Sequence, residues 1–91
     1  MKPSELLAKP EAWTRESEAR QADGYPVLPE SATACKWCII GAIRKCARKQ
    51  VDVSTWSNKV AILIGGGIES WNDMPGRTHA EVLELLRRDG P

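Results

Sequence analysis

The sequence has no long apolar run. Its two longest, Cys38 to Ile43 and Val60 to Ile64, are far shorter than the ~20 residues that a membrane-spanning helix needs. The first seven residues also lack the apolar stretch of a signal peptide. These absences exclude a membrane-spanning protein, and we expect a cytoplasmic protein with no membrane partner.

The net charge is also small. Thirteen Lys and Arg residues against twelve Asp and Glu residues give a formal net charge of +1. Such a chain has no overall field to attract nucleic acid or an anionic membrane, so binding of either would need a local patch. Charged residues make up 27% and apolar residues 42% of the chain, which is typical of an ordinary soluble protein. We expect one domain, residues 1–91, with a modest core.

Phe is absent and Tyr occurs once, so Trp supplies most of the aromatic bulk. Because Trp buries a large apolar area, the four Trp residues are expected to be the main space-filling anchors of the core. The alternative is that one or two are exposed as hot spots for a binding partner. The four are Trp13, Trp37, Trp56 and Trp71.

Apolar spacing and turn residues predict a mainly α-helical fold, a compact bundle of three to four helices. Near the N-terminus, Ser4 can cap a short helix, which Pro10 then interrupts. The helical pattern later disappears, and Asp23-Gly24 is a strong tight-turn signal. We expect a short β-hairpin there, joining residues 18–20 to residues 25–28.

Two longer helices are predicted after this hairpin. The first begins at Ser31 or Thr33, runs to about Lys49, and is apolar nearly all round, as expected for a central helix. A glycine near its middle would let a neighbouring element approach closely. The second helix is capped by Asp52 or Ser54 and ends at three consecutive glycines.

The C-terminal third has the strongest local signals. Residues 69–77 are predicted to form a loop, in which residues 74–77 suit a type II turn with proline second and glycine third. Thr78 and Glu81 then form a capping box. This box opens a last helix, which ends near Asp89-Gly90.

Two segments carry a resemblance to other proteins. They are Trp37-Cys38-Ile39-Ile40-Gly41-Ala42 and the stretch from Trp71 to Leu83, which begins Trp-Asn-Asp-Met-Pro-Gly-Arg-Thr. With the Asp23-Gly24 turn, they resemble a family of domains of unknown function found in bacteria and their phages. The resemblance implies a bacterial or phage origin and a compact helical domain, and it brings no activity, cofactor or partner. Cys35 and Cys46 depart from the family pattern.

The three Cys residues and the single His are candidates for chemistry. An odd number of Cys without an export signal indicates reduced thiols, which pack as small apolar side chains in a core. A zinc site is disfavoured, because a continuous helix would separate Cys38 from Cys46 by ~12 Å along its axis. Sulfur ligands of one zinc lie within roughly 4 Å of each other. We therefore expect no metal and no cofactor.

A thiol-dependent enzyme or redox protein is the alternative function. Cys35 and Cys38 form a C-x-x-C motif, which can lower a thiol pKa, but the βαβ pattern of a thioredoxin-like scaffold is absent. Cys38, His79 and Asp73 would supply a thiol, an imidazole and a carboxylate. However, Cys38 inside an apolar helix would be protonated and inert. In the structural interpretation, His79 faces the core while Asn72 and Asp73 brace the turn.

Four basic residues gather at the end of the first long helix. Basic side chains beside an aromatic residue can hold phosphates and stack a base, so a weak nucleic-acid interface is a second alternative. Four charges on a near-neutral domain are a weak signal, and a solvated helix end is the simpler interpretation. The residues are Arg44, Lys45, Arg48 and Lys49.

The sequence favours a small non-enzymatic interaction or regulatory module with an unidentified protein partner. Capped helices, four Trp residues and a rigid loop suit a scaffold that presents a surface to another protein. By analogy with small phage proteins, we expect a regulatory action on a host protein. The oligomeric state stays open. The predicted binding surface is Trp71, Asn72, Asp73 and Arg77, with the four basic residues as second choice.

Overall fold

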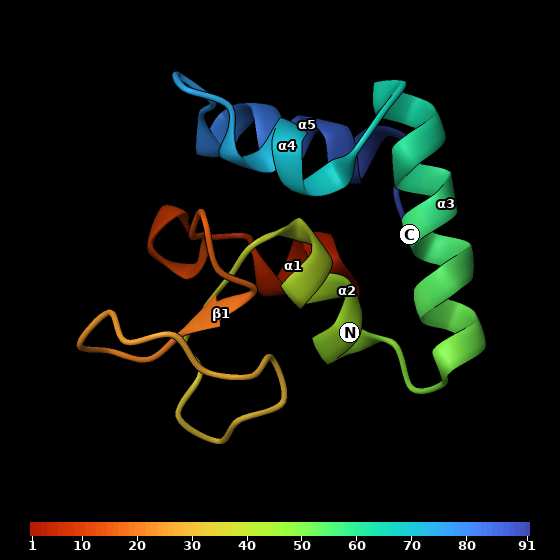
Figure 1. Cartoon of the computed structure of the whole chain (residues 1–91). Helices are drawn as coiled ribbons and strands as arrows, with labels where there is room; N and C mark the ends of the chain where they lie inside the picture. The colour runs from red at the N-terminus through yellow and green to blue at the C-terminus, as the bar shows by residue number, and fades with distance from the viewer.

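Figure 1 shows the computed structural model, which describes the backbone of residues 1–91 and every side chain except that of Asp89. The described chain contains five α-helices, a 3-10 turn and a two-stranded sheet, which confirms the predicted mainly α-helical fold. In chain order the elements are α1 (Pro3–Leu6), η1 (Pro10–Ala12), β1 (Ala19–Arg20), β2 (Lys36–Trp37), α2 (Ile39–Cys46), α3 (Gln50–Ile64), α4 (Ile68–Asp73) and α5 (His79–Asp89).

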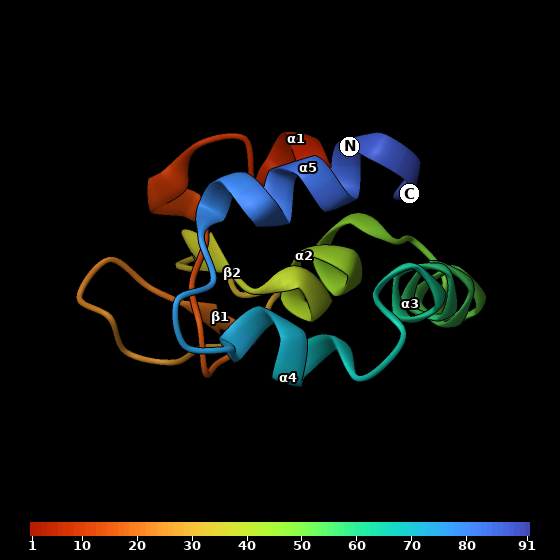
Figure 2. The same ribbon diagram turned by 90° about the horizontal axis from the view of Figure 1, so that it is seen from above.

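Helix α2 lies at the centre of the arrangement. It contacts α1, α3 and α4, while α5 packs beside α1 (Figure 2). Its side chains Ile39, Ala42 and Ile43 are fully buried, as expected for the predicted central helix. The buried core draws on every helix and on both strands or the segments beside them; its members are Leu7, Ala19, Trp37, Ile39, Ala42, Ile43, Val60, Ile68, Val82, Leu85 and Leu86.

The predicted start of this central helix, at Ser31 or Thr33, is wrong. Cys38 is the N-cap, with extended backbone, and its Sγ accepts a hydrogen bond from the Gly41 amide at 3.3 Å. The backbone amides of Cys35 and Cys38 donate instead to carbonyls of the β1 region, those of Arg20 and Glu18. Because these two amides are already bonded to the β1 region, they cannot also donate to carbonyls of a helix. The helix therefore begins after Cys38.

The sheet also differs from the predicted hairpin. β1 pairs antiparallel with β2, which lies well beyond the Asp23-Gly24 turn. The turn itself is present: the Gln21 amide donates to the Tyr25 carbonyl at 3.0 Å, and an isolated bridge joins Arg20 to Pro26. Proline has no amide to donate, so the pairing across the Asp23-Gly24 turn ends after a few residues. The strand that pairs regularly with β1 is β2.

The boundaries of the other N-terminal and middle helices shift slightly. Lys2, and not Ser4, is the cap of α1. Helix α3 begins at Gln50, before the predicted Asp52 or Ser54, and Lys49 is its N-cap, so the predicted end of the preceding helix at Lys49 is also wrong. It ends as predicted, at Gly65 in the left-handed conformation. At 15 residues it is the longest helix, and no helix in the described chain is long and apolar enough to cross a membrane.

Residues 69–77 do not form one loop. The first part belongs to α4, whose Ile68 is buried in the core. The type II turn follows as predicted, with Gly76 at φ +84° and the Arg77 amide donating to the Met74 carbonyl at 2.9 Å.

The predicted capping box is present at the start of α5. The Thr78 hydroxyl accepts from the Glu81 amide at 3.2 Å, and the Glu81 carboxylate accepts from the Thr78 amide at 2.8 Å. This box fixes the direction in which α5 leaves the turn.

Only one of the four Trp residues is fully enclosed. Trp37 is buried, and its indole nitrogen donates to the Pro29 carbonyl at 3.1 Å. Trp13, Trp56 and Trp71 are half-buried and pack against the edge of the core. The expectation of core anchors therefore holds fully for Trp37 and in part for the other three.

Gly41 lies where α2 crosses the chain at Glu18. A Cβ at position 41 would lie 1.8 Å from the Glu18 carbonyl oxygen, so the backbones must separate to admit it. We expect Gly41→Ala to lower the free energy of unfolding by about 1–3 kcal/mol, measured by urea unfolding. Gly66→Ala is the control, since a Cβ there meets nothing within 4 Å. Equal stability of the two variants would contradict this close approach.

Candidate functional site

A buried asparagine on α4 joins three parts of the chain. Asn72 is fully buried. Its Oδ1 accepts from Trp13 Nε1 at 2.9 Å and from the Ile39 amide at 3.2 Å. Its Nδ2 donates to the Thr14 carbonyl at 3.2 Å and to Asp73 Oδ1 at 2.9 Å. The amide's two donors and two lone pairs are thus all used, and this residue of the predicted surface does not reach solvent.

Asp73 continues the same connection. Its Oδ1 also accepts from the Glu16 amide at 2.9 Å, and Glu16 has a left-handed backbone, φ 66°. The Arg15 guanidinium donates to the backbone carbonyls of Asp73 and Met74. The C-terminal end of α4 is therefore fastened to residues 14–16, and Asp73 has a structural task.

Trp71 and Arg77, the other two residues of the predicted surface, lie against each other. The guanidinium carbon of Arg77 is 3.7 Å from the centre of the Trp71 ring, which is a close cation–π contact. Arg77 Nε donates to the Trp71 carbonyl at 3.0 Å, and Nη1 forms an ion pair with Glu81 at 3.1 Å. These contacts hold the guanidinium against one face of the indole.

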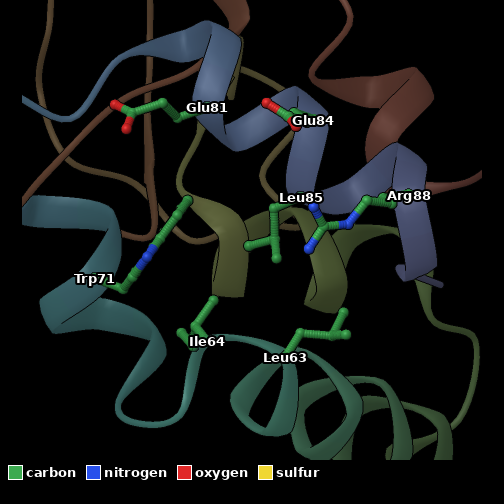
Figure 3. Close-up of a pocket in the computed structure, with 7 residues that line it drawn as sticks. All are labelled: Leu63, Ile64, Trp71, Glu81, Glu84, Leu85 and Arg88. Carbon is green, nitrogen blue, oxygen red and sulfur yellow. The ribbon is translucent and has the colours of Figure 1, made fainter.

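Two hollows share this indole in their lining. The larger, of about 360 Å³, lies between α3, α4 and α5 (Figure 3), and we name it the Trp71 groove. It is lined by Leu63, Ile64, Trp71, Glu81, Glu84, Leu85 and Arg88. A second hollow, of about 210 Å³, is lined by Ile64, Gly66, Gly67, Ser70, Trp71 and Met74. Trp71 and Ile64 thus line both hollows.

The Trp71 groove has an apolar wall and charges of both signs at its edge. In Figure 3, Leu63 and Ile64 of α3 face Leu85 of α5. Glu81 and Glu84 lie along α5, and the Arg88 guanidinium reaches toward the hollow beside Leu85. Hydrogen bonds from Thr78 and the nearby Arg77 charge hold the pKa of Glu81 below its usual range. Glu81 is therefore a carboxylate at neutral pH.

The candidate thiol site is not assembled. Cys38 was expected inside a helix but caps one, and burial raises the pKa of its thiol. His79 Nε2 lies 2.7 Å from the Leu7 carbonyl, and its ring packs 6.4 Å from that of Trp13. Among the described side chains, no hydrogen bond joins Cys38 to His79. Asp73 is nearer, since it lines a small hollow of about 60 Å³ with Cys38.

The other two thiols lie apart from this position. Cys35 is exposed just before β2, and Cys46 is half-buried at the end of α2. Burial also raises the pKa of the Cys46 thiol. In the part of the chain whose side chains are described, no three His, Cys, Asp or Glu residues are arranged to hold a metal ion.

The basic residues span two elements and not one helix end. Arg44 and Lys45 belong to the last turn of α2, whereas Arg48 and Lys49 lie in the connection to α3. All four are exposed, and both Arg44–Glu18 oxygen distances are 2.8 Å. Three of them line a hollow of about 440 Å³ whose wall includes Glu30. Glu30 thus lies among the basic residues, and Glu18 is paired with one of them.

These features define a small helical domain that is tied together by a buried amide and carries a tryptophan that stacks on an arginine and lines two hollows. Residues 4–88 match a family of unknown function, DUF6197, and the chain belongs to that family. The resemblance seen in the sequence is therefore confirmed. No curated protein and no solved structure matches the chain.

Sequence reasoning missed the groove and the burial of Asn72. A usable signal was present, since Ile68, Trp71 and Asn72 have the i, i+3, i+4 spacing of one helix face. That spacing predicts a short helix in place of a loop. It would have placed Asn72 beside the buried Ile68.

Removing the Asn72 amide should destabilise the whole domain. Asn72→Ala leaves the Trp13 indole nitrogen, the Ile39 amide and the Thr14 carbonyl without a protein partner, and each such group costs about 1–3 kcal/mol. We expect the free energy of unfolding to fall by about 3 kcal/mol or more, measured by urea unfolding. Ser70→Ala, on the exposed side of the same helix, is the control. A loss below about 0.5 kcal/mol would show that the amide is dispensable.

Thiol labelling distinguishes the three cysteines. Exposed Cys35 should react first with iodoacetamide at neutral pH, and Cys38 last, because its thiol is covered and its pKa is raised. Peptide mass spectrometry measures the three rates, and in denaturant all three should become similar. Labelling of Cys38 as fast as Cys35 in the folded protein would contradict this order and support the thiol-dependent enzyme.

Proposed function

We propose that this domain is a non-enzymatic interaction module that binds a protein partner at the Trp71 groove. The observation that supports this most is the stacking of Trp71 on Arg77 in the lining of two hollows. Trp and Arg are the residue types most enriched among binding hot spots. A side chain that neighbouring contacts already orient loses less conformational entropy when a partner covers it.

The groove suits an apolar side chain with a basic neighbour. Leu63, Ile64 and Leu85 offer an apolar wall, Glu84 is exposed at the edge, and Arg88 lies beyond it at the end of the groove away from Glu81. A partner segment that inserts a Leu, Ile or Phe and carries a Lys or Arg beside it would match both surfaces. The volume of about 360 Å³ is near the low end of ligand sites, roughly 300–1,000 Å³, which favours a few side chains over a large cofactor.

The other functions are less well supported. Thiol chemistry would need a reactive thiolate, whereas burial raises the pKa of Cys38 and His79 has other partners. Nucleic-acid binding would favour a patch of cations alone, whereas Arg44 is paired with Glu18 and Glu30 lines the same hollow as the basic residues. A regulatory action on another protein, such as that of a phage-encoded protein on a host protein, remains the role we propose by analogy.

Site-specific photocrosslinking tests this proposal. Leu63, which is 36% exposed in the lining of the Trp71 groove, is replaced by a photoreactive amino acid, and the protein is irradiated in lysate. We expect a crosslinked protein that is absent when the label replaces Leu28, which is 74% exposed between β1 and β2.

The crosslinked protein is then purified and titrated against variants. Trp71→Ala and Glu84→Lys should each weaken binding at least about tenfold, about 1.4 kcal/mol. Added salt should weaken binding of the wild type and of Trp71→Ala, which both keep Glu84, but not that of Glu84→Lys. Circular dichroism verifies the fold. Equal crosslinking at both positions, no crosslink at Leu63, or binding unaffected by both variants would contradict the proposal.

A further inference from the structure

Helix α3 turns one side to the core and the opposite side to solvent. Of its described residues, only Val60 is fully buried. At 100° per residue, the side opposite Val60 carries Val51, Thr55, Asn58 and Ile62, all exposed. Val51 is 63% and Ile62 80% exposed. Figure 2 places α3 at the margin of the molecule, so this outer face is open along its length.

The outer face has the spacing of a helix-pairing seam. Its residues 51, 55, 58 and 62 are separated by four, three and four positions, the a/d interval by which two helices interlock. The ends of the seam are apolar, and Thr55 and Asn58 in the middle are polar. In paired helices a polar residue at such a position fixes register and orientation.

We propose that two copies of this chain pair through the outer face of α3, with the two helices antiparallel about a twofold axis. This arrangement sets Val51 of each copy against Ile62 of the other. It also sets Thr55 against Asn58, whose hydroxyl and amide can hydrogen-bond. Both exposed apolar side chains and both central polar ones thus find a complementary neighbour.

Charge complementarity selects the antiparallel pairing. Asp52 and Lys59 flank the seam on the same side at helical spacing. The twofold axis keeps this flank on one side of the pair, and Asp52 of one copy comes within about 3 Å, two residues of helical rise, of the level of Lys59 of the other. Two opposite-charge pairs therefore form.

The charges at the ends of α3 also favour the antiparallel pairing. Arg48 and Lys49 are exposed at the N-terminal end, where the helix dipole disfavours positive charge. A parallel pair would bring the two basic ends together. The antiparallel pair instead sets each basic end against the last turn of the other helix, where the dipole attracts cations.

The association should be weak and independent of the Trp71 groove. A 15-residue helix is ~22 Å long, and one helix–helix seam is smaller than the ~1,200 Å² of most stable interfaces. We expect reversible dimers at high micromolar concentration. No residue of the seam lines the groove, so neither proposal requires the other.

Sedimentation equilibrium of the purified full chain tests the pairing from about 10 µM to about 1 mM. The mean mass should rise reversibly with concentration, and Ile62→Glu should lower the association constant at least about tenfold. Leu28→Glu is the control, since it places a charge on an equally exposed apolar residue outside α3. A monomer at about 1 mM, or a dimer indifferent to Ile62→Glu, would overturn the proposal.

Exchanging charges tests the orientation. Asp52→Lys and Lys59→Asp should each weaken the dimer, because each places like charges together, and the double variant should recover the wild-type association constant within about threefold. Circular dichroism shows whether α3 remains helical in each. A double variant no stronger than the single variants would overturn the antiparallel register.

Discussion

The hydrogen bonds of the Asn72 amide hold together segments that are distant in the sequence. Trp13 and Thr14 lie 59 and 58 positions away, and Ile39 lies 33 away. In water-excluded surroundings such bonds are strong, and an unpaired group is costly. The apolar core of a 91-residue chain is modest, so this polar link fixes a position for α4 that apolar packing alone would define less sharply. The orientation of Trp71, one residue earlier, follows from it.

Arginine side chains serve the irregular part of the chain in a similar way. Arg20 donates to the Thr14 hydroxyl and to the carbonyls of Arg15 and Gly24, and Arg15 in turn reaches the end of α4. The planar guanidinium has five donors in a fixed geometry, so one side chain can hold several loop carbonyls. Two of the thirteen Lys and Arg residues therefore serve to hold these loops in place.

Local signals in the sequence were sufficient wherever the structure depends on near neighbours. The capping box at Thr78, the type II turn at Gly76 and the helix stop at Gly65 each involve residues within about four positions, and each was predicted. The start of α2 was not, because the amides of Cys35 and Cys38 are claimed by residues 15 to 20 positions earlier. The candidate site was likewise predicted only in part. Trp71 and Arg77 were both assigned to the predicted surface, and the structure adds that they contact each other; the groove, with walls from three helices, has no local pattern.

Helix α3 is joined to the core by one fully buried side chain, Val60, and by half-buried ones that pack against it. Leu63 and Ile64 on this helix form one wall of the Trp71 groove, whereas Trp71 belongs to α4 and Leu85 to α5. The width of the groove is therefore set by how α3 lies relative to α4 and α5. The size of the side chain that the groove admits depends on the packing of Val60 as much as on the residues that line it.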